Sequence, residues 1–484
     1  MMEIESMKLN LFLLTPLLIT FCLSLSYAQL DRSRKPEPQP TPKITLPVIQ
    51  RAALANGLKI LLVERHGLPI VQMQLVLQTG SASDPPAKSG IANLTAQMVR
   101  EGTGKRGSLK IADDLEYLGA SLSIYSTTDA TLASMLTLKE HLPAALEIYS
   151  DVLCNPSFPD SEWTRIKKTH LTGLMQRKDR PVAVADNVFA QLLYGSSEPY
   201  GRPTDGTDAS VKLVSLDDLK TFYKTNYVPN NATLIVVGDV TVAEVVPILQ
   251  NCFGNWKAGT PSLPLFSSAP KIDSTRIYLI DKPQAAQSEI RIGHVGIARS
   301  NPDYFPVVVM NAILGGQFTS RINLNLREAK GYTYGARSGF AFRKEAGPFI
   351  AQAGVKSAVT DSSVIEFMKE LRGICDADVS QKELDFAKNS LVRGMPQGFE
   401  TPGQISSQLV NVVLYNLPDD YFNTVVQNLE KVSIADVRRV AQQYLHPNSM
   451  DIVVVGDVAL TRPGLDKLGY GKTMLLDPDG KRIE

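Results

Sequence analysis

The sequence predicts an α+β protein made of two tandem homologous domains, because three short segments recur at a constant offset of 218 residues. The matching pairs are 214–219 with 432–437, 229–230 with 447–448, and 236–240 with 454–458. One Val-Val-Gly-Asp-Val match would be weak evidence, but three ungapped matches at one offset indicate duplication. Strand and helix patterns are mixed without strict β-α alternation, which favours α+β over a doubly wound parallel sheet.

The individual elements follow from local patterns. In the first half, strands are predicted at 58–63 and 71–77, and helices at 144–153 and 162–176. Each half then closes with a capped helix, a Pro-Asn turn, a β-branched strand and a Gly-Asp turn. The predicted segments are a signal peptide at 1–28, a proline-rich linker at 29–47, domains at 48–260 and 270–465 with a second linker at 258–270 between them, and a C-terminal tail at 466–484.

The first residues predict export. Lys8 precedes a mainly apolar run at 9–25, and Ser26-Tyr27-Ala28 is a small-x-small cleavage pattern typical of a secretory signal peptide. The alternative is an uncleaved anchor, since the run is almost long enough to span a bilayer. Pro16 and the polar residues of the run favour cleavage. We therefore expect a soluble protein in the periplasm or otherwise exported.

The composition is that of an ordinary globular protein, with 44% hydrophobic and 20% charged residues and a net charge of +1. At this charge neither nucleic acid nor an acidic membrane surface is expected as a partner. Three cysteines remain after signal cleavage, Cys154, Cys252 and Cys375, and they are odd in number and far apart. Free thiols are the simplest case, and no disulfide framework or cysteine zinc site is implied.

The segment 89–103 predicts a short amphipathic helix, because Ile91, Leu94 and Met98 share one apolar face. Here the chain resembles the pitrilysin/insulinase (inverzincin) superfamily of metallopeptidases, particularly its smaller members akin to mitochondrial processing peptidase subunits. The resemblance extends from Ala-Leu-Ala-Asn-Gly-Leu at 53–58 through the second Gly-Asp strand. It implies two domains, each a mainly antiparallel sheet with helices packed on it, that form a clamshell chamber.

Family members carry His-x-x-Glu-His on this helix, where two histidines hold zinc and the glutamate activates water. The corresponding positions here are Asn93, Ala96 and Gln97. The family's third ligand, a glutamate on a later helix, falls near Gly173, and no glutamate lies between positions 162 and 198. Neutral amides are poor zinc ligands and alanine cannot take a proton. The resemblance therefore implies a degenerate zinc site, no cofactor in this chain, and zinc in a partner subunit.

The five histidines, at positions 66, 141, 170, 294 and 446, offer no local replacement for this site. No two of them lie within five residues of each other, so none forms a local ligand pair. Each is expected to be a surface histidine or a core histidine with its hydrogen bonds satisfied. A zinc site assembled from distant histidines stays open as an alternative.

A second pattern lies in the other half, where Leu-Gly-Gly-Gln-Phe-Thr-Ser-Arg begins at 314 and Leu-Arg-Glu-Ala-Lys-Gly-Tyr-Thr-Tyr begins at 326. It predicts a helix that ends at Lys330, a cap at Gly331 and a strand from Tyr332. From the residues alone, an arginine near a helix end and a tyrosine in a strand are better explained as structural, because the arginine complements the helix dipole and tyrosine is a good strand former.

The resemblance assigns a function to this second pattern. It implies that Arg327 and Tyr334 form the substrate-side half of an active site: Tyr334 would donate to the scissile carbonyl oxygen and Arg327 would hold the peptide backbone. Gly315 and Gly316 would let the loop approach substrate, and Tyr332 is the rival for the tyrosine role. The strands at 121–128 and 129–138 look like the family's substrate-bearing hairpin, and the alternative is a plain sheet hairpin.

Together these patterns predict the non-catalytic subunit of an exported heteromeric zinc peptidase. Its partner would be a homologous zinc-bearing chain, in a heterodimer or larger assembly, and its substrate an extended peptide. The chain alone is expected to be inactive. Two alternatives use the same fold without peptidase activity: a structural or scaffolding protein, as in core subunits of respiratory complexes, and a protein that binds and sequesters peptides.

Overall fold

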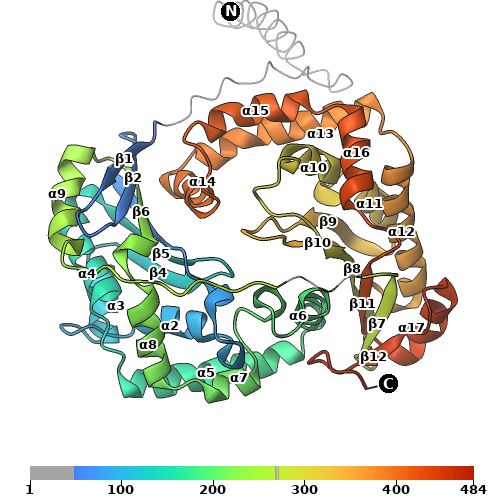
Figure 1. Ribbon diagram of the computed structural model, residues 1–484, viewed down its shortest axis with the longest axis horizontal. Coiled ribbons are helices and arrows are strands. Elements are labelled where there is room, and N and C mark those ends of the chain that lie inside the picture. Colours follow the sequence, from blue (N-terminus) through green and yellow to red (C-terminus); the bar gives the residue numbers. More distant parts are fainter. Residues whose placement is uncertain (1–47, 268–269, 271, 484) are drawn as a thin grey trace, which may run out of the picture. The chain divides into compact units, whose positions relative to one another are not determined.

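The computed structural model describes residues 48–267, 270 and 272–483 (Figure 1). The predicted signal peptide at 1–28 and the proline-rich linker at 29–47 lie outside the described residues. Between the two halves of the chain, residues 256–267 form no helix or strand. None of the helices in the described ranges is both long enough and apolar enough to cross a membrane.

Two six-stranded sheets form the framework, one from each half of the chain (Figure 1). The first has the order β1-β2-β6-β3-β5-β4, built from β1 Gln50–Ala53, β2 Lys59–Glu64, β3 Ile70–Leu77, β4 Ser121–Ser126, β5 Thr131–Leu138 and β6 Ala232–Gly238. The second has the order β12-β7-β11-β8-β10-β9, built from β7 Arg276–Asp281, β8 Gln287–Val295, β9 Thr333–Phe340, β10 Pro348–Lys356, β11 Asp451–Gly456 and β12 Met474–Leu476.

Both sheets are mainly antiparallel, and the same pair of strands is parallel in each. The parallel pairs are β2 with β6 in the first sheet, and β7 with β11 in the second, where β12 also runs parallel to β7. The strands β6 and β11, which the internal repeat places in equivalent positions, hold equivalent places in the two sheets. The structure therefore confirms the predicted α+β fold with two homologous domains.

Helices cover the sheets in an equivalent order in the two halves. Those of the first half are α2 Ile91–Val99, α3 Ser108–Tyr117, α4 Leu142–Cys154, α5 Asp160–Lys178, α6 Pro181–Tyr194, α7 Asp208–Leu213, α8 Leu216–Asn226 and α9 Val242–Phe253. Those of the second half are α10 Tyr304–Asn311, α11 Arg321–Asn323, α12 Thr360–Asp376, α13 Gln381–Gly394, α14 Pro402–Leu414, α15 Tyr421–Lys431, α16 Ile434–Tyr444 and α17 Val458–Leu465.

The repeated capped helices are α8 and α16, and both begin with the same reciprocal capping box. Ser215 accepts from the backbone N–H of Asp218, whose carboxylate accepts from the Ser215 N–H, and Ser433 and Asp436 repeat the arrangement. Two otherwise unpaired backbone donors are satisfied in each case. The capping signals in the sequence therefore mark both helix starts correctly.

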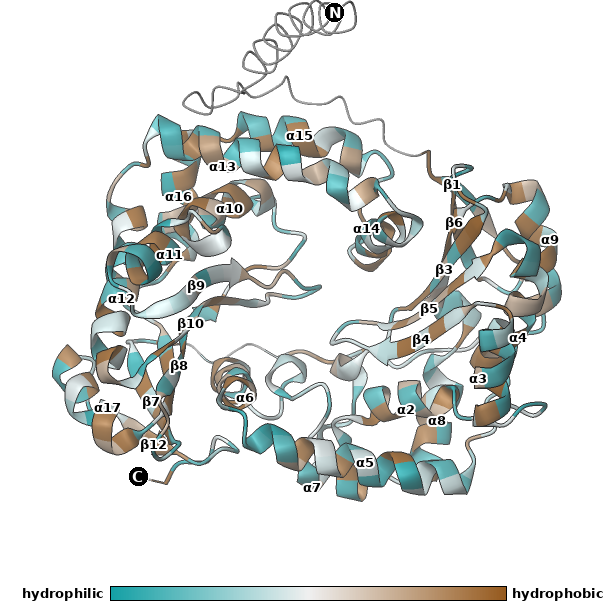
Figure 2. Ribbon diagram, turned by 180° about the vertical axis from the view of Figure 1, so that it is seen from behind, coloured by the Kyte–Doolittle hydropathy of each residue, from teal (hydrophilic) through white to brown (hydrophobic). Residues whose placement is uncertain are grey.

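The two halves exchange one helix each. Helix α6 of the first half packs on β8 and β11 of the second sheet, and α14 of the second half packs on β3 and β6 of the first. Phe189 of α6 is buried in a cluster with Val453, and Leu409 of α14 is buried in a cluster with Ile235. Every residue of β6 and β11 is buried, and the central strands are strongly hydrophobic (Figure 2). A sheet covered on both faces explains these continuous apolar runs.

The predicted C-terminal tail at 466–484 is in part a strand. Residues 474–476 form β12, which pairs with β7, and Leu476 is buried in the cluster that α6 also joins. The side chain of Asp466 accepts from the backbone N–H and the hydroxyl of Thr473, which fixes the turn that leads to β12. The second domain therefore continues beyond residue 465, because the short strand covers an otherwise open sheet edge.

The helix exchange generates a stability prediction. Phe189→Ala removes a ring that is 1% exposed, so we expect the free energy of unfolding to fall by about 3–5 kcal/mol. Phe386→Ala is the matched control, because the Phe386 side chain is 53% exposed and its loss is expected to change stability by roughly 0.5 kcal/mol or less. Denaturant unfolding of the two variants measures both values. Equal effects would show that α6 does not stabilise the second sheet.

Candidate functional site

The start of α2 is held in place by Asp84. Its buried carboxylate accepts from the backbone N–H groups of Gly90, at 2.6 Å, and Ala92, at 3.1 Å. Burial raises the pKa of Asp84 to about 7, although both hydrogen bonds act in the opposite direction. Gly90 has a φ of 97°, and a Cβ there would lie 2.7 Å from the backbone oxygen of Asp205. The helix and the loop before α7 therefore meet with no room for a side chain at this point.

The three degenerate motif positions of α2 divide between surface and core. Asn93 and Gln97 are partly exposed on one side of the helix, as the i, i+4 spacing predicts, whereas Ala96 is fully buried. Gln97 donates to the Asn93 side chain at 2.5 Å, and Asn93 donates to the carboxylate of Asp205 at 2.6 Å. The two amides are thus engaged with neighbouring side chains of the same chain.

Helix α5 completes this network with His170 and Arg177. His170 donates through Nε2 to the backbone oxygen of Asp205 at 2.8 Å, and its Nδ1 lies 3.4 Å from the Gln97 amide nitrogen. Arg177 forms an ion pair with the second carboxylate oxygen of Asp205. Asn93, Asp205, His170 and Gln97 therefore close a ring of hydrogen bonds between α2, α5 and the loop before α7. Arg177 joins this ring through the carboxylate of Asp205.

The environment keeps His170 neutral. Burial lowers its pKa to about 4, and the positive charge of Arg177 acts in the same direction. The hydrogen bonds agree, because one ring nitrogen donates to a carbonyl and the other accepts from the Gln97 amide. Gly173, one turn along the same helix, has no atom within 4 Å of where a Cβ would stand.

This donor set does not fit zinc. Asn93 and Gln97 offer neutral amides that are already hydrogen-bonded, Ala96 and Gly173 offer no ligand atom, and a zinc ion would face the charge of Arg177. Within the described ranges, no group of three or more His, Cys, Asp or Glu is arranged to hold a metal ion. Instead, the hydrogen bonds of this surface connect α2, α5 and the loop before α7.

One histidine pair that the sequence could not predict lies in the second half, where buried His294 contacts exposed His446. The rings of His294 and His446 are 4.9 Å apart, and His294 accepts from the backbone N–H of His446 while it donates to the carbonyl of Val295. Burial lowers the pKa of His294 to about 4. Both ring nitrogens of His294 are satisfied within the protein, as expected for a core histidine.

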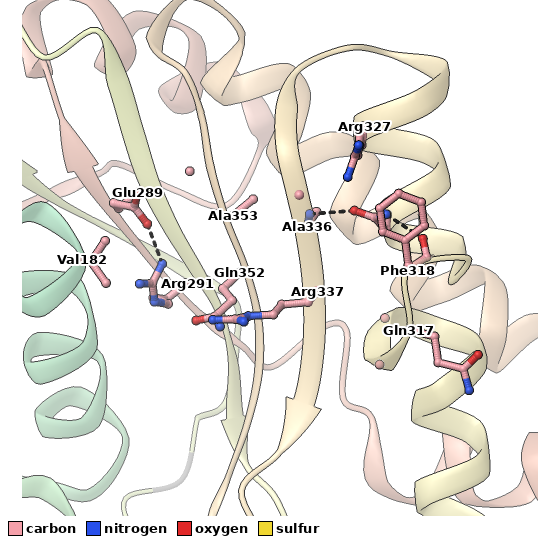
Figure 3. A pocket seen from close by; sticks show the side chains of 15 residues that line it. Val182, Glu289, Arg291, Gln317, Phe318, Arg327, Ala336, Arg337, Gln352 and Ala353 are labelled. Carbon is pink, nitrogen blue, oxygen red and sulfur yellow. Dashed lines mark hydrogen bonds and ion pairs between the residues drawn. The ribbon is translucent and has the colours of Figure 1, made fainter. Parts of the chain in front are cut away.

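The second candidate site is a cavity of about 460 Å³ in the C-terminal domain (Figure 3). Of the residues predicted from sequence, Gly315, Gly316 and Arg327 line it. Arg327 pairs with Glu328 at 3.1 Å and lies over the ring of Phe318, with 4.5 Å between the guanidinium carbon and the ring centroid. The cavity therefore has one cationic wall beside an exposed aromatic ring.

Two π-helical segments shape this cavity, at Ala312–Gly316 and Leu324–Ala329. In the second, the backbone N–H of Lys330 bonds to the carbonyl of Asn325, and Gly331 follows with a φ of 64°. The glycine ends the helical segment as the sequence predicts. π-Helical segments are rare in proteins overall, and many of those that occur lie at functional sites. Here they place the glycine turn and Arg327 on the same cavity.

The glycine turn has a structural reason as well. A Cβ at Gly315 would overlap Ser338 of β9, and one at Gly316 would lie 2.8 Å from the side-chain nitrogen of Asn311. The two glycines therefore allow the helix end to approach the sheet closely. Their predicted contact with substrate stays a prediction. Asn323 joins this turn to β9, because it donates to the carbonyl of Phe318 at 2.6 Å and accepts from the backbone N–H of Ala336 at 3.0 Å; Figure 3 labels Phe318 and Ala336.

Neither of the two candidate tyrosines, Tyr334 and Tyr332, lines the cavity. The Tyr334 side chain is 88% exposed, next to a register shift between β9 and β10. Tyr332 is partly buried, and its backbone N–H bonds to the carbonyl of Leu326. Among the described residues no hydrogen bond joins Arg327 to either tyrosine. The structure thus places the arginine in the cavity and the tyrosine on the adjoining surface.

The predicted hairpin at 121–138 is present as β4 and β5, paired in register from Ser121 with Leu136 to Ser126 with Thr131. Strand β4 is an edge strand of the first sheet. It therefore has unpaired backbone groups along one side, which is the requirement for adding a peptide strand. Whether a peptide binds there stays a prediction.

Sequence reasoning missed several residues of both sites. Asp205, His170 and Arg177 contact the degenerate motif only because the loop before α7 folds against α2 and α5. The sequence gives a weak signal for the two residues on α5, since His170 precedes Gly173 by three residues and Arg177 follows it by four. In the cavity it missed Arg291, whose neighbours in the sequence suggest only an ordinary strand.

Two sequence profiles match the chain, one described as Insulinase (Peptidase family M16) over residues 59–204 and one as Peptidase M16 inactive domain over residues 214–391. The fold and the site define a two-domain relative of metallopeptidases, and the chain belongs to the insulinase family, peptidase family M16. The resemblance seen in the sequence is therefore confirmed, and the chain groups with inactive, non-peptidase members of the family.

The alignments with several related proteins extend over most of the chain. The Non-peptidase homolog YmxG of Helicobacter pylori is 24% identical over 400 residues, which are 81% of this chain and 90% of that protein. The Mitochondrial-processing peptidase subunit beta of Lentinula edodes is 24% identical over 439 residues, 85% of this chain and 91% of that protein. A solved structure of a peptidase M16 inactive domain from Pseudomonas fluorescens has a TM-score of 0.79 and 29% identity, and covers 84% of this chain and 98% of that one.

The polar ring predicts the titration of His170. In the folded protein its imidazole should protonate near pH 4, far below the ordinary value of about 6.5, whereas His66, whose pKa is raised by Asp239 and Glu64, should protonate above it. Because the folded pKa is depressed, the contribution of His170 to stability is present above pH 6.5 and is lost as the pH falls towards 4.

Side-chain NMR of the histidine rings measures both values. Arg177→Gln removes a nearby positive charge, so the His170 pKa should rise in that variant while that of His66 stays unchanged. A His170 ring that titrates at 6.5 or higher in the wild-type protein would mean that the ring of hydrogen bonds does not form in solution.

Proposed function

We propose that this protein is the non-catalytic subunit of an exported heteromeric zinc peptidase. The observation that carries the proposal is a contrast between the two domains. On α2, the amides of Asn93 and Gln97 are tied into internal hydrogen bonds, whereas in the second domain Arg327 and the glycine turn line an open cavity. A homologous partner chain is proposed to carry the zinc.

The second domain would then serve substrate binding. Arg327, which lines the cavity, would hold the backbone of an extended peptide. The hydroxyl of Tyr334 is exposed and free to donate to a carbonyl oxygen on which negative charge develops, with Tyr332 as the less exposed alternative. Export rests on the predicted signal peptide at 1–28.

Two of the relatives support different parts of the proposal. One is named a non-peptidase homologue, which agrees with a chain that has no zinc chemistry of its own. Another is named as one subunit of a processing peptidase, which agrees with a role in a complex of several chains. The assembly, its stoichiometry and the peptide substrate belong to the proposal.

Reconstitution tests the proposal. The purified chain is assayed for peptide cleavage alone, and then mixed with a zinc-bearing homologue from the same exported fraction. We expect no cleavage by the chain alone and cleavage by the mixture that a chelator abolishes. Chelator-sensitive cleavage that is the same with and without the homologue would contradict the proposal.

Single substitutions then separate a subunit that binds substrate from a scaffold. Arg327→Ala and Tyr334→Phe should each lower kcat/KM of the complex by about 10²- to 10³-fold without dissociating it, because each removes a donor to the substrate. Arg372→Ala is the matched control, since Arg372 is exposed on α12 away from the cavity. Full activity of the Tyr334→Phe complex would favour the scaffolding alternative.

A further inference from the structure

A row of three polar side chains, two of them arginines, crosses three neighbouring strands at one wall of the cavity. Gln352 of β10 stands in register with Arg291 of β8 on one side and with Arg337 of β9 on the other. Residues paired in register point to the same face of a sheet, and all three side chains line the cavity (Figure 3). Neighbouring strands lie about 4.8 Å apart, which places the two arginine backbones roughly 10 Å apart with an amide between them.

The charge of Arg291 is balanced inside the protein. Its side chain is only 4% exposed, and it pairs with Asp186 of α6 at 2.6 Å and with Glu289 at 3.1 Å. These two carboxylates offset the positive charge of the buried guanidinium. Arg291 supports this wall of the cavity and holds α6 against the sheet.

The charge of Arg337 is not balanced in this way. No hydrogen bond or ion pair joins its side chain to any other residue in the described part of the chain, and its register partner on β10 is the neutral Gln352. Across the cavity Arg327 has only Glu328 as a carboxylate partner, and Glu328 does not line the cavity. Glu289 is the one acidic residue among those lining it, against three arginines.

The cavity also adjoins backbone that a peptide can reach. Strand β9 is an edge strand of the second sheet, and its Gly335, like Gly354 of the neighbouring β10, lines the cavity without a side chain. A Cβ at Gly335 would have no atom closer than 3.9 Å. Part of this edge is already paired, because the Ala336 N–H donates to the Asn323 side chain and the Ser338 carbonyl accepts from the Asn311 side chain. An extended chain could therefore approach the backbone at Gly335 rather than pair along the whole strand. That the ligand is a peptide follows from the proposed function.

We propose that this cavity binds a carboxylate of an extended peptide, held by Arg337 with the amide of Gln352 as a further donor and with Arg327 adding positive charge to the same cavity. Guanidinium groups bind carboxylates with paired, charge-assisted hydrogen bonds. The carboxylate comes either from an acidic side chain or from the C-terminus of the peptide. The inference rests on the proposed function in one respect, that the ligand is a peptide, and it gives that peptide an acidic character.

Binding to the isolated full-length mature chain tests the inference without any partner. The probes are three fluorescein-labelled decapeptides of one sequence: one with central glutamates and an amidated C-terminus, one with glutamines in their place and an amidated C-terminus, and one with glutamines and a free C-terminus. Fluorescence anisotropy gives each affinity at low and at moderate salt.

We expect the glutamate peptide or the free C-terminus peptide to bind at least about tenfold more tightly than the amidated glutamine peptide, with affinity that falls as salt rises. The peptide that binds identifies the source of the carboxylate. Arg337→Gln should remove the preference, and Arg337→Lys should retain only part of it. Arg372→Gln is the control of equal charge change and should bind as the wild type does.

Equal affinity for the three peptides, no binding of any of them, or an unchanged preference in Arg337→Gln would overturn the inference. Circular dichroism of Arg337→Gln confirms that the variant is folded. If the acidic preference is absent, the proposed function is still tested separately by reconstitution. A reconstituted peptidase that cleaves all three peptides equally would contradict only the acidic preference. A chain that prefers the acidic peptide but never forms an active complex would contradict only the proposed function.

Discussion

Asp205 forms the contacts on which the degenerate site depends. Its carboxylate accepts from Asn93 and pairs with Arg177, and its backbone oxygen accepts from His170. The amide of Gln97 closes the ring between Asn93 and His170. Because each side chain finds a partner within the chain, the surface needs neither a metal ion nor an external ligand to satisfy its polar groups. A metal ion would have to break these hydrogen bonds and approach a guanidinium.

The two halves of the duplicated chain therefore differ at their candidate sites. The first domain uses its former motif helix as a polar joint between α2, α5 and the loop before α7. The second domain keeps a cavity shaped by two π-helical segments and lined by arginines. The helix exchange couples the domains, since α6 of the first half lines that cavity through Val182 and pairs with Arg291 through Asp186. The cavity of the second domain is complete only with a helix from the first.

Local signals in the sequence predicted most of the fold. The capping boxes at Ser215 and Ser433 and the repeated Val-Val-Gly-Asp-Val strands each depend on neighbouring residues, and all are present in the structure. The short strand β12 was predicted as tail because three residues carry too little pattern to distinguish a strand from a polar end. The exchange of α6 and α14 was not predicted, because the apolar face of a helix does not indicate which sheet it covers.

The sequence predicted those features of the two sites that depend on residues close together in the chain. The i, i+4 spacing placed Asn93 and Gln97 on one side of α2, and the glycine after Lys330 ended its helix. The ring through Asp205 joins residues more than 100 positions apart in the sequence, and the row of Arg291, Gln352 and Arg337 depends on strand register. A single sequence specifies neither of these relations directly.

The zinc content of the isolated chain tests the central claim most directly. The purified protein is equilibrated with a small excess of zinc, passed through a desalting column and analysed for bound metal by atomic spectroscopy. The account predicts far less than one zinc per chain, because the α2 surface offers hydrogen-bonded amides and a guanidinium in place of histidine and glutamate ligands. One tightly held zinc per chain, lost on substitution of Asn93 or Gln97, would contradict it.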